Sequence, residues 1–280
     1  MLLKGIAALS CVIAVIFCYI GGWFASPSWL LALPLSFLVS VLALAVLTFL
    51  VVWVSCLLVD QDKPQERDSK YYRTLMNLCI EAVVPFSGAR IHTAGLEQIP
   101  REGRFLLLCN HLSMADPVVL LRCLPDRQLA FISKRENKDM FIVGKLMHKT
   151  LGQLINREND REALRTILKC IELIREDKAS VAVFPEGYTS LDGKLHHFRA
   201  GVLKIAQKTK VPIVVCTLRN TNDLLGNFKK LKPTDIHFRV AGVISPDAQQ
   251  GHTTTDIAAM AYDMMLADLG EEFRMPEEKA

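Results

Sequence analysis

The feature that most constrains this fold is the apolar run at the start of the sequence, because residues 5–59 contain no charged side chain. Apart from Lys4, every Lys, Arg, Asp and Glu of the 280-residue chain comes at or after Asp60. A charge-free stretch of this length is typical of a segment that lies in a lipid bilayer. We therefore predict a transmembrane helical hairpin over residues 1–60, followed by a domain over residues 61–280 that is long enough for one substantial core.

Residues that break helices divide this apolar run into two spans. Gly21, Pro27 and Pro34 lie within it, and glycine and proline end a helix more readily than they continue it. The first span, residues 6–24, would form a helix about 28 Å long, close to the bilayer hydrocarbon thickness of roughly 30 Å. The second span, residues 35–59, is long enough to cross with some tilt. The pattern predicts a hairpin that returns the chain to the side of the membrane where it began.

The basic residues that flank the hairpin indicate which side this is. Lys4 precedes the first span, and four basic residues follow the second: Lys63, Arg67, Lys70 and Arg73. By the positive-inside rule we expect a cell-membrane protein whose larger domain lies on the cytoplasmic face. The alternative for residues 1–26 is a cleavable signal peptide. The eight cysteines argue against export, because those after Asp60 are scattered singly with no C-x-x-C pair, as free thiols in a reducing compartment would be.

Beyond Asp60 the sequence alternates short apolar runs with longer amphipathic ones. The short runs predict strands at residues 90–93, 104–109, 129–133, 153–156, 180–184, 213–218 and 236–243. The amphipathic runs predict helices at residues 117–124, 139–150, 160–176, 200–208 and 255–269. Repetition of a strand followed by a helix predicts an α/β fold, with a largely parallel central sheet flanked by helices.

Polar residues follow several of the predicted strands at the point where each strand ends. Asn110 and His111 follow one strand, and Lys134, Arg157 and Glu186 come at or just after the ends of three others. Parallel strands end at the same edge of a sheet, and the reactive residues of such sheets gather in the loops beyond that edge. We therefore expect these side chains to lie close together.

His111 and Asp116 are candidates for a catalytic pair. Asp116 comes immediately before Pro117, so it is expected to be the N-cap of a helix that begins at Pro117. The intervening loop can then bring the carboxylate to one imidazole nitrogen, which fixes the tautomer and raises the basicity of the other nitrogen. No G-x-S-x-G nucleophile accompanies the pair, but a His-Asp dyad can deprotonate a hydroxyl supplied by a substrate. The alternative is a capping Asp beside a surface His.

Four segments resemble, in order, the sequence boxes of the glycerolipid acyltransferases, and in particular the 1-acylglycerol-3-phosphate (lysophosphatidic acid) acyltransferase family. Residues 110–116 are similar to the N-H-x-S-x-x-D box. The other three boxes are matched by G-Q-L-I-N-R at 152–157, F-P-E-G-Y-T-S at 184–190 and V-P-I-V-V at 211–215. The F-R-A-G stretch at 198–201 resembles the basic-glycine stretch that follows the third box. Together the matches span residues 105–218.

The resemblance implies an enzyme of phospholipid biosynthesis, an acyltransferase that makes phosphatidic acid. The acyl group would come from acyl-CoA or acyl-carrier protein as co-substrate, and the acceptor would be the free hydroxyl of 1-acylglycerol-3-phosphate, which is lysophosphatidic acid. His111 would be the general base on that hydroxyl and Asp116 the residue that orients it, without an acyl-enzyme. Base catalysis by a placed His is typically worth about 10² to 10⁴ in rate.

The resemblance also implies a set of binding residues. By the match to the second box, Arg157 would hold the lipid phosphate, which suits a charge-assisted fork. Glu186 and Gly187 would shape the glycerol pocket. Asn110 and Ser113, the other polar residues of the first box, are assigned to the substrate site, and Lys134 is a further phosphate candidate because its strand ends on the same rim.

No cofactor or metal is expected. His196 and His197 are adjacent, but they have no companion Cys or acidic ligand at a recognisable spacing, so we predict a surface pair. The net charge is +4, and a basic cluster is formed by Arg127, Lys134, Arg135, Lys138, Lys145 and Lys149. Such a cluster would suit anionic lipid or a phosphorylated carrier, and the alternative is a solvated helix face. The sequence contains no nucleic-acid-binding motif.

One departure from the family pattern leaves the acceptor open. The third box of the family usually carries Arg where this sequence has Thr189, and Thr where it has Tyr188. The loss of that cation removes one expected phosphate contact, which favours an acyltransferase acting on a different lysolipid. A catalytically silent lipid-binding membrane protein that kept the fold is a further alternative, and intact His111 and Asp116 argue against it. A third is a lipid hydrolase in which the dyad activates water.

Overall fold

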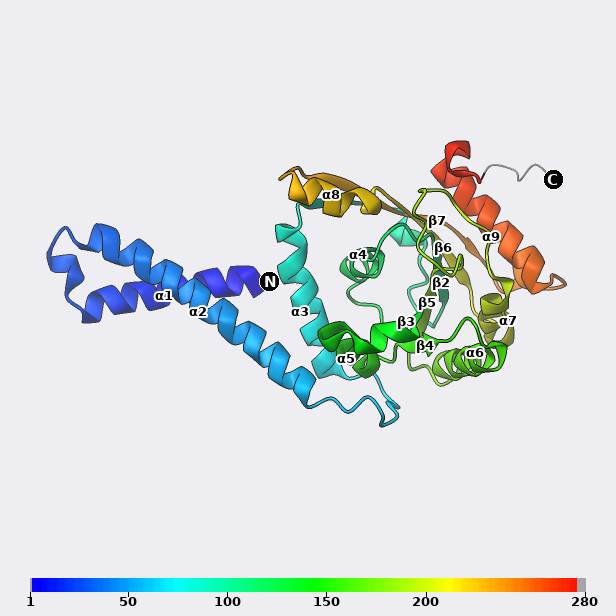
Figure 1. Cartoon of the computed structure of the whole chain (residues 1–280), viewed down its shortest axis with the longest axis horizontal. Helices are drawn as coiled ribbons and strands as arrows, with labels where there is room; N and C mark the ends of the chain where they lie inside the picture. Colours follow the sequence, from blue (N-terminus) through cyan, green and yellow to red (C-terminus); the bar gives the residue numbers. More distant parts are fainter. Residues whose placement is uncertain (1, 276–280) are drawn as a thin grey trace.

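Two long apolar helices project from an α/β domain in the computed structural model, which describes residues 2–275 (Figure 1). Helix α1 comprises Leu2–Ile20 and helix α2 comprises Trp29–Leu57. Both are long and apolar enough to cross a membrane by length and composition. Most of their large apolar side chains are exposed, so the domain itself provides no core for them. The predicted pair of apolar N-terminal helices is confirmed.

The boundaries of these helices correct two details of the prediction. Pro34 does not break the second helix, because α2 begins at Trp29 and contains it. Proline removes only one backbone hydrogen bond, and here that loss falls near the start of the helix, where few such bonds have yet formed. The first helix ends at Ile20 rather than Phe24, since Gly22 adopts a left-handed conformation with φ 66° and turns the chain into the short 3-10 helix Trp23–Ala25.

A seven-stranded sheet forms the centre of the domain, in the order β1-β7-β6-β2-β5-β3-β4. Its pairings are parallel except for β6 with β7, so the sheet is largely parallel, as predicted. The strands are β1 (Ala89–Ala94), β2 (Leu106–Cys109), β3 (Leu129–Lys134), β4 (Gln153–Ile155), β5 (Ser180–Val183), β6 (Ile213–Arg219) and β7 (Thr234–Ile244). Strands β2 to β6 therefore end at one edge, and β1 and β7 begin there.

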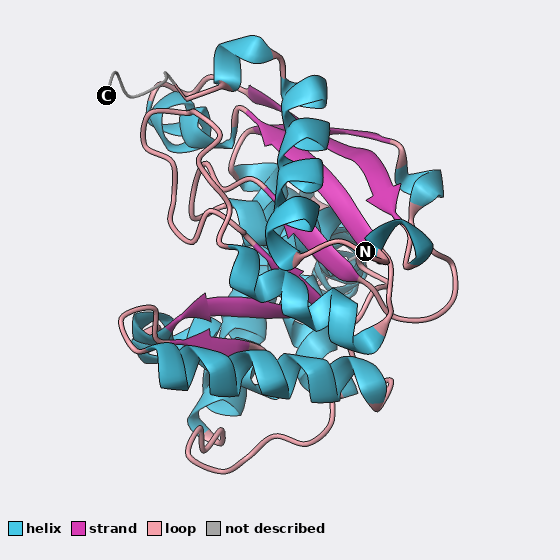
Figure 2. Ribbon diagram, turned by 90° about the vertical axis from the view of Figure 1, so that its right-hand side faces the viewer, coloured by secondary structure: helices cyan, strands magenta, loops and turns pink. Residues whose placement is uncertain are grey.

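Alternate residues of the central strands build two separate cores. On β2, Leu106 and Leu108 face one core, while Leu107 and Cys109 face the other. This period of two is the pattern of strands that are buried on both faces. The strands accordingly lie in the interior with helices around them (Figure 2). Helices α6, α7 and α9 contribute to the first core and α4 to the second.

The helices of the domain are α3 (Lys70–Phe86), α4 (Asp116–Cys123), α5 (Phe141–Lys149), α6 (Asp160–Arg175), α7 (Lys204–Thr209), α8 (Leu224–Lys229) and α9 (Thr254–Leu269). The predicted helices are confirmed, although two begin later than expected because their first residues form the 3-10 helices Arg135–Asp139 and Ala200–Leu203. Helices α3 and α8 were not predicted. Asp116 is the first residue of α4 rather than its N-cap, which is Ala115.

Candidate active site

The loop between β2 and α4 brings His111 and Asp116 together. His111 Nδ1 lies 2.8 Å from Asp116 Oδ2. The same carboxylate oxygen accepts hydrogen bonds from the backbone N–H groups of Leu112 at 2.7 Å and Ser113 at 2.8 Å. A carboxylate oxygen can only accept, so Nδ1 carries the proton and Nε2 presents a lone pair. Asp116 is fully buried while the imidazole is part-exposed, so the pair has one fixed member and one that can meet a substrate.

The free nitrogen of His111 faces a hydroxyl from the loop that follows β5. Thr189 Oγ1 lies 3.1 Å from His111 Nε2. The imidazole also stacks on the Phe184 ring, with centroids 4.2 Å apart and planes at 18°. The backbone N–H of Ser190 donates to the His111 carbonyl at 2.7 Å, which ties the two loops together. The arrangement is a hydroxyl, an imidazole and a carboxylate in line, in which Nε2 can accept a proton from a hydroxyl.

Glu186 holds the His111 loop through hydrogen bonds to the backbone. Its side chain is buried, and its two carboxylate oxygens accept from the backbone N–H groups of His111 at 2.8 Å and His196 at 3.0 Å. Burial raises the pKa of Glu186 to about 7, although these two hydrogen bonds oppose the shift. The sequence assigned Glu186 to a glycerol pocket; in the structure its carboxylate is occupied by the protein backbone and positions the base.

Asn110 and Ser113, also assigned to the substrate site, are engaged within the protein. The Asn110 amide donates to the Leu218 carbonyl at 2.9 Å and accepts from the Leu218 N–H at 2.7 Å, which joins the ends of β2 and β6. Ser113 Oγ accepts from the N–H of Ala115 at 3.0 Å and turns the chain into α4. Both residues therefore shape the loop that holds His111.

Two arginines, Arg157 after β4 and Arg199 before α7, act on each other through their charges. Burial lowers the pKa of Arg157, and the nearby guanidinium of Arg199 lowers it further, with Glu136 opposing. Arg199 also packs on Gly187, where an added Cβ would lie 2.6 Å from Arg199 Nε. Gly187 has φ 85°, so the position requires glycine both for its backbone conformation and for this contact. Sequence reasoning gave Arg199 no role, although its place in the F-R-A-G stretch was a signal.

The remaining predicted positions lie further out. Lys134 is exposed at the end of β3, where it pairs with Ile155 of β4. His196 is not simply a surface residue, because its ring nitrogens lie 2.8 Å from Tyr188 Oη and 2.9 Å from Asp192 Oδ1. His197 is exposed and stacks on Tyr262. Within residues 2–275, no group of three or more His, Cys, Asp or Glu side chains is placed to hold a metal.

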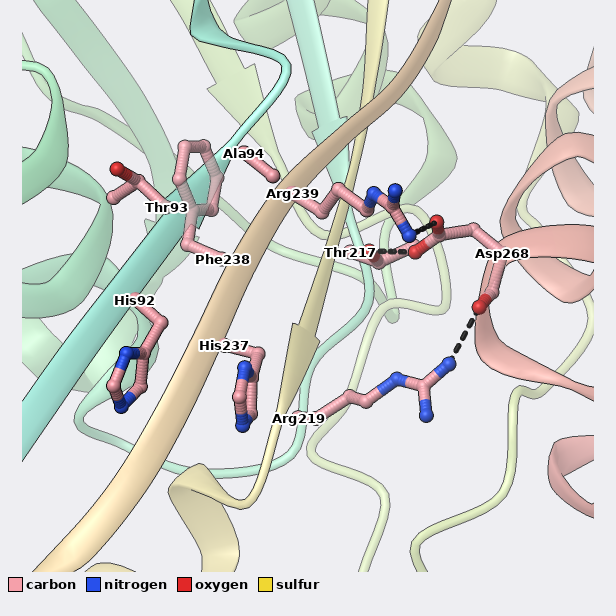
Figure 3. A pocket seen from close by; sticks show the side chains of 9 residues that line it. All are labelled: His92, Thr93, Ala94, Thr217, Arg219, His237, Phe238, Arg239 and Asp268. Atoms are coloured by element: carbon pink, nitrogen blue, oxygen red, sulfur yellow. Dashed lines mark hydrogen bonds and ion pairs between the residues drawn. The ribbon is translucent and has the colours of Figure 1, made fainter.

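A cavity of about 330 Å³ lies over strands β1, β7 and β6, and it does not contain the dyad (Figure 3). The end of α9 completes its lining. Asp268 engages its cationic side chains, because Oδ1 pairs with Arg239 at 3.2 Å and the backbone carbonyl accepts from Arg219. His92 and His237 stack across the neighbouring strands, with centroids 5.0 Å apart. The cations of this cavity are largely partnered within the protein.

Comparison with known proteins finds a matching family model and similar acyltransferases. Residues 90–219 match the family model described as Acyltransferase. A 1-acyl-sn-glycerol-3-phosphate acyltransferase of Chlamydomonas reinhardtii is 30% identical over 223 residues, which are 79% of this chain and 61% of that protein. One from Borreliella burgdorferi is 28% identical over 149 residues, which are 53% of this chain and 59% of that protein.

A solved structure shares the fold. The crystal structure of the 1-acyl-sn-glycerophosphate acyltransferase from Thermotoga maritima superposes with a TM-score of 0.58 and 20% sequence identity, over 81% of this chain and 89% of that one. The chain spans about three-fifths of the length of the two relatives above. The matched segment, residues 90–219, contains His111, Asp116, Arg157, Glu186 and Arg199.

Proposed function

We propose that the chain, whose residues 90–219 match the Acyltransferase family model, is an acyltransferase that transfers a fatty acyl group to the free hydroxyl of 1-acylglycerol-3-phosphate, giving phosphatidic acid. The observation that carries the proposal is the His111–Asp116 pair at the carboxyl edge of the sheet, with Nε2 directed at a hydroxyl. The relatives named as 1-acyl-sn-glycerol-3-phosphate acyltransferases support this choice of acceptor.

The geometry supports a direct transfer. The acceptor hydroxyl takes the position at Nε2 that the Thr189 hydroxyl holds, 3.1 Å away, and gives its proton to that nitrogen. The acceptor oxygen attacks the thioester carbonyl of the donor, the C–S bond breaks, and the departing thiolate takes the proton from the imidazolium. Asp116 stabilises the imidazolium through Nδ1 and keeps the ring in place. Base catalysis of this kind supplies about 10² to 10⁴ in rate, so positioning of the two substrates supplies much of the rest.

Arg157 and Arg199 together form the proposed phosphate site. Two neighbouring guanidinium groups, one of them partly buried, repel each other, and a phosphate dianion between them relieves that repulsion with charge-assisted hydrogen bonds. Arg199, from the F-R-A-G stretch, is the second cation of this proposed site. Lys134 is a further phosphate candidate at the outer rim.

A different lysolipid acceptor is the second candidate, and Thr189 is the observation that favours it. The Thr189 hydroxyl contacts the base and carries no charge, so the site has one cation fewer than the family pattern with which to bind a phosphate monoester. Acceptors with a larger or neutral head group lose less from that absence.

The donor and the cellular setting complete the proposal. Acyl-CoA or acyl-carrier protein provides the thioester, and no cofactor is required. The two apolar helices support a location in the cell membrane, where the proposed lysolipid substrate resides. The basic residues that flank the hairpin favour a catalytic domain on the cytoplasmic face.

The test is an acceptor panel with the purified full-length chain. Lysophosphatidic acid and lysolipids with other head groups are each incubated with labelled acyl-CoA and labelled acyl-carrier protein, with His111→Ala as the inactive control. We expect phosphatidic acid as the main product. Preferred acylation of another lysolipid would support the second candidate. Release of free fatty acid alone would instead identify a hydrolase, and absence of both products would identify a lipid-binding protein without activity.

A further inference from the structure

Two leucines of this domain have a left-handed backbone conformation, and only one of them is covered. Leu151 has φ 66° and Leu231 has φ 53°. A bulky side chain in this conformation is unfavourable, so it persists only where hydrogen bonds or packing compensate. Leu151 is 1% exposed and is compensated by the core, whereas Leu231 is 92% exposed. The backbone of Leu231 is held by the end of α8, where the N–H of Leu231 donates to the Phe228 carbonyl at 3.0 Å and the N–H of Lys232 donates to the Asn227 carbonyl at 2.9 Å. The Leu231 side chain, in contrast, is left without cover, although glycine would meet the same backbone requirement.

Other apolar side chains are exposed around Leu231. Leu225 and Phe228 project from α8 with 66% and 49% of their surface exposed, and Val83 and Phe86 from the end of α3 with 59% and 71%. The two segments are neighbours, because the N–H of Thr234 donates to the Gly88 carbonyl at 2.9 Å and Gly88 lies against Lys232. We call these five residues, Val83, Phe86, Leu225, Phe228 and Leu231, the α3–α8 patch. A contiguous exposed apolar patch on a folded domain marks an interaction surface.

Positive charge lies within the same surface. Lys229, Lys230 and Lys232 are all exposed and flank Leu231 in the sequence. The nearest exposed acid in the chain is Asp235, whose carboxylate lies 2.8 Å from His92 Nε2. Lysines beside apolar side chains are typical of a segment that lies in the interface of an anionic membrane. Each such lysine contributes about a fivefold gain in partitioning to an anionic lipid surface.

The α3–α8 patch lies near the two apolar helices and near the sheet edge that carries the dyad. Helices α3 and α8 lie on the side of the domain from which α1 and α2 project (Figure 1). The N-terminal end of α1 contacts α3 directly, where the N–H of Leu2 donates to Glu81 Oε2 at 3.4 Å. Helix α8 follows β6, whose Leu218 holds the Asn110 amide next to His111. The patch therefore continues the surface of the membrane anchor and lies at the same sheet edge as the dyad.

We propose that the α3–α8 patch is a second membrane contact, which inserts Leu231 and its apolar neighbours into the interface of an anionic bilayer. The lysines hold the lipid head groups while the apolar side chains enter the acyl boundary. This contact presses the carboxyl edge of the sheet against the membrane, so that a lysolipid can reach His111 without leaving the surface. The exposed side chain of Leu231 is then covered by lipid instead of protein.

Lys210 provides a matched control. It has φ 55°, is exposed and ends the short helix α7, as Leu231 follows the end of α8. It precedes β6, however, and so lies at the opposite edge of the sheet from α8. A probe at position 210 therefore experiences the same kind of backbone and the same exposure, without the proposed membrane contact.

The experiment measures lipid contact by fluorescence quenching on the full-length chain in vesicles. The three cysteines that are not buried, Cys11, Cys79 and Cys123, are replaced by alanine, and an environment-sensitive fluorophore is attached through Leu231→Cys or Lys210→Cys. The vesicles contain phosphatidylcholine with or without phosphatidylglycerol, and a fraction of the lipid carries a spin label near the top of its acyl chain. We expect the probe at position 231 to lose most of its emission, more so with phosphatidylglycerol, and the probe at position 210 to lose little.

Equal quenching at the two positions would overturn the proposal, as would quenching at position 231 that is indifferent to phosphatidylglycerol. Absence of quenching together with cross-linking between two chains at position 231 would show that the patch binds a second copy instead. Leu225→Cys carries the same probe on the patch without altering the strained residue, so a folding defect in the first variant cannot conceal the result. The readout needs no enzymatic activity and is independent of the proposed function.

Discussion

The two halves of the candidate active site are built in different ways. The base half, residues 110–116, is one short loop in which a single oxygen of Asp116, Oδ2, accepts three hydrogen bonds. Glu186 and Ser190, from outside this loop, bind the backbone of His111. The cation half brings Arg157 from the end of β4 to Arg199 from the loop before α7, and one of these side chains is exposed. The base is held by several hydrogen bonds within a few consecutive residues, whereas the two cations come from segments that are distant in the chain.

This difference suggests a division of labour between chemistry and selectivity. A base must be held in one orientation, because small displacements of a reacting group are costly. The residues of a head-group site can vary while the hydrogen bonds from Asp116 and Glu186 continue to hold the base. We therefore expect changes in the base half to act on kcat and changes in the cation half to act on KM, as the following predictions test.

The largest effect is expected for His111→Ala. Removal of the base should lower kcat by about 10² to 10⁴ with little change in acceptor KM, because only proton transfer in the transition state is lost. The thermal midpoint should stay close to that of the parent chain, since Glu186 binds the backbone rather than the ring at this position. His197→Ala is the control, because that side chain is exposed away from the loop. Near-normal turnover of His111→Ala would rule out the mechanism.

Asp116→Asn should have a smaller effect on kcat, but it should also affect folding. An amide can still accept from Nδ1–H, yet it cannot stabilise the imidazolium by charge. Asp116 is fully buried, and its hydrogen bonds from Leu112 and Ser113 lose their charge assistance when the carboxylate becomes an amide, which should lower the free energy of unfolding by roughly 1–3 kcal/mol. Steady-state kinetics and thermal unfolding of the same sample measure both effects. A kcat loss equal to that of His111→Ala would show that His111 has no activity as a base without the Asp116 carboxylate.

Truncation in the cation half should act on binding. Arg157→Ala and Arg199→Ala should each raise the KM for lysophosphatidic acid about tenfold to a hundredfold, as expected for a lost charge-assisted hydrogen bond. Arg161→Ala, an exposed arginine at the start of α6, should leave KM unchanged. An acceptor with a neutral head group should be affected much less. Equal loss for all acceptors would mean that Arg157 and Arg199 are structural.

Glu186 should make stability depend on pH. Its pKa is raised by burial to about 7 in the folded chain, above its ordinary value of 4.5. The folded state therefore binds the proton more tightly, and the resulting stability is complete below about pH 4.5 and is lost as the pH rises through about 7. Glu186→Gln should remove this slope and lower the thermal midpoint at acid pH, because the amide cannot accept from both His111 and His196. Parallel pH profiles for the two chains would contradict this account.

The smallest effect is expected for Thr189→Val. The acceptor hydroxyl displaces the Thr189 hydroxyl from Nε2 in our mechanism, so loss of that hydroxyl should change kcat less than about tenfold, the value of one neutral hydrogen bond. Abolition of transfer would instead identify Thr189 as a nucleophile that forms an acyl-enzyme. The companion variant Thr189→Arg should improve the use of lysophosphatidic acid relative to acceptors with neutral head groups. If the order of preference among acceptors is unchanged, the residue at position 189 does not determine head-group selectivity.

Much of the fold could be predicted because its signals are local. The charge-free run, the apolar strands and the amphipathic helices are each written into consecutive residues, and the structure has them within a few positions. Helix α3 was missed for a physical reason, because its last turn contains Val83, Val84 and Pro85, which are poor helix formers. Its packing against α1, α4 and α5 decides the conformation there.

The sequence alone determined the residues of the base half. His111 and Asp116 are close in the chain, and the strand before them and the helix after them leave one short loop, so their contact follows from local geometry. The direction of β7, the proximity of Arg199 to Arg157 and the contact of Thr189 with Nε2 were decided only by the tertiary structure. These contacts join residues distant in the chain, and such pairs are chosen by the packing of the whole sheet, which no local pattern encodes.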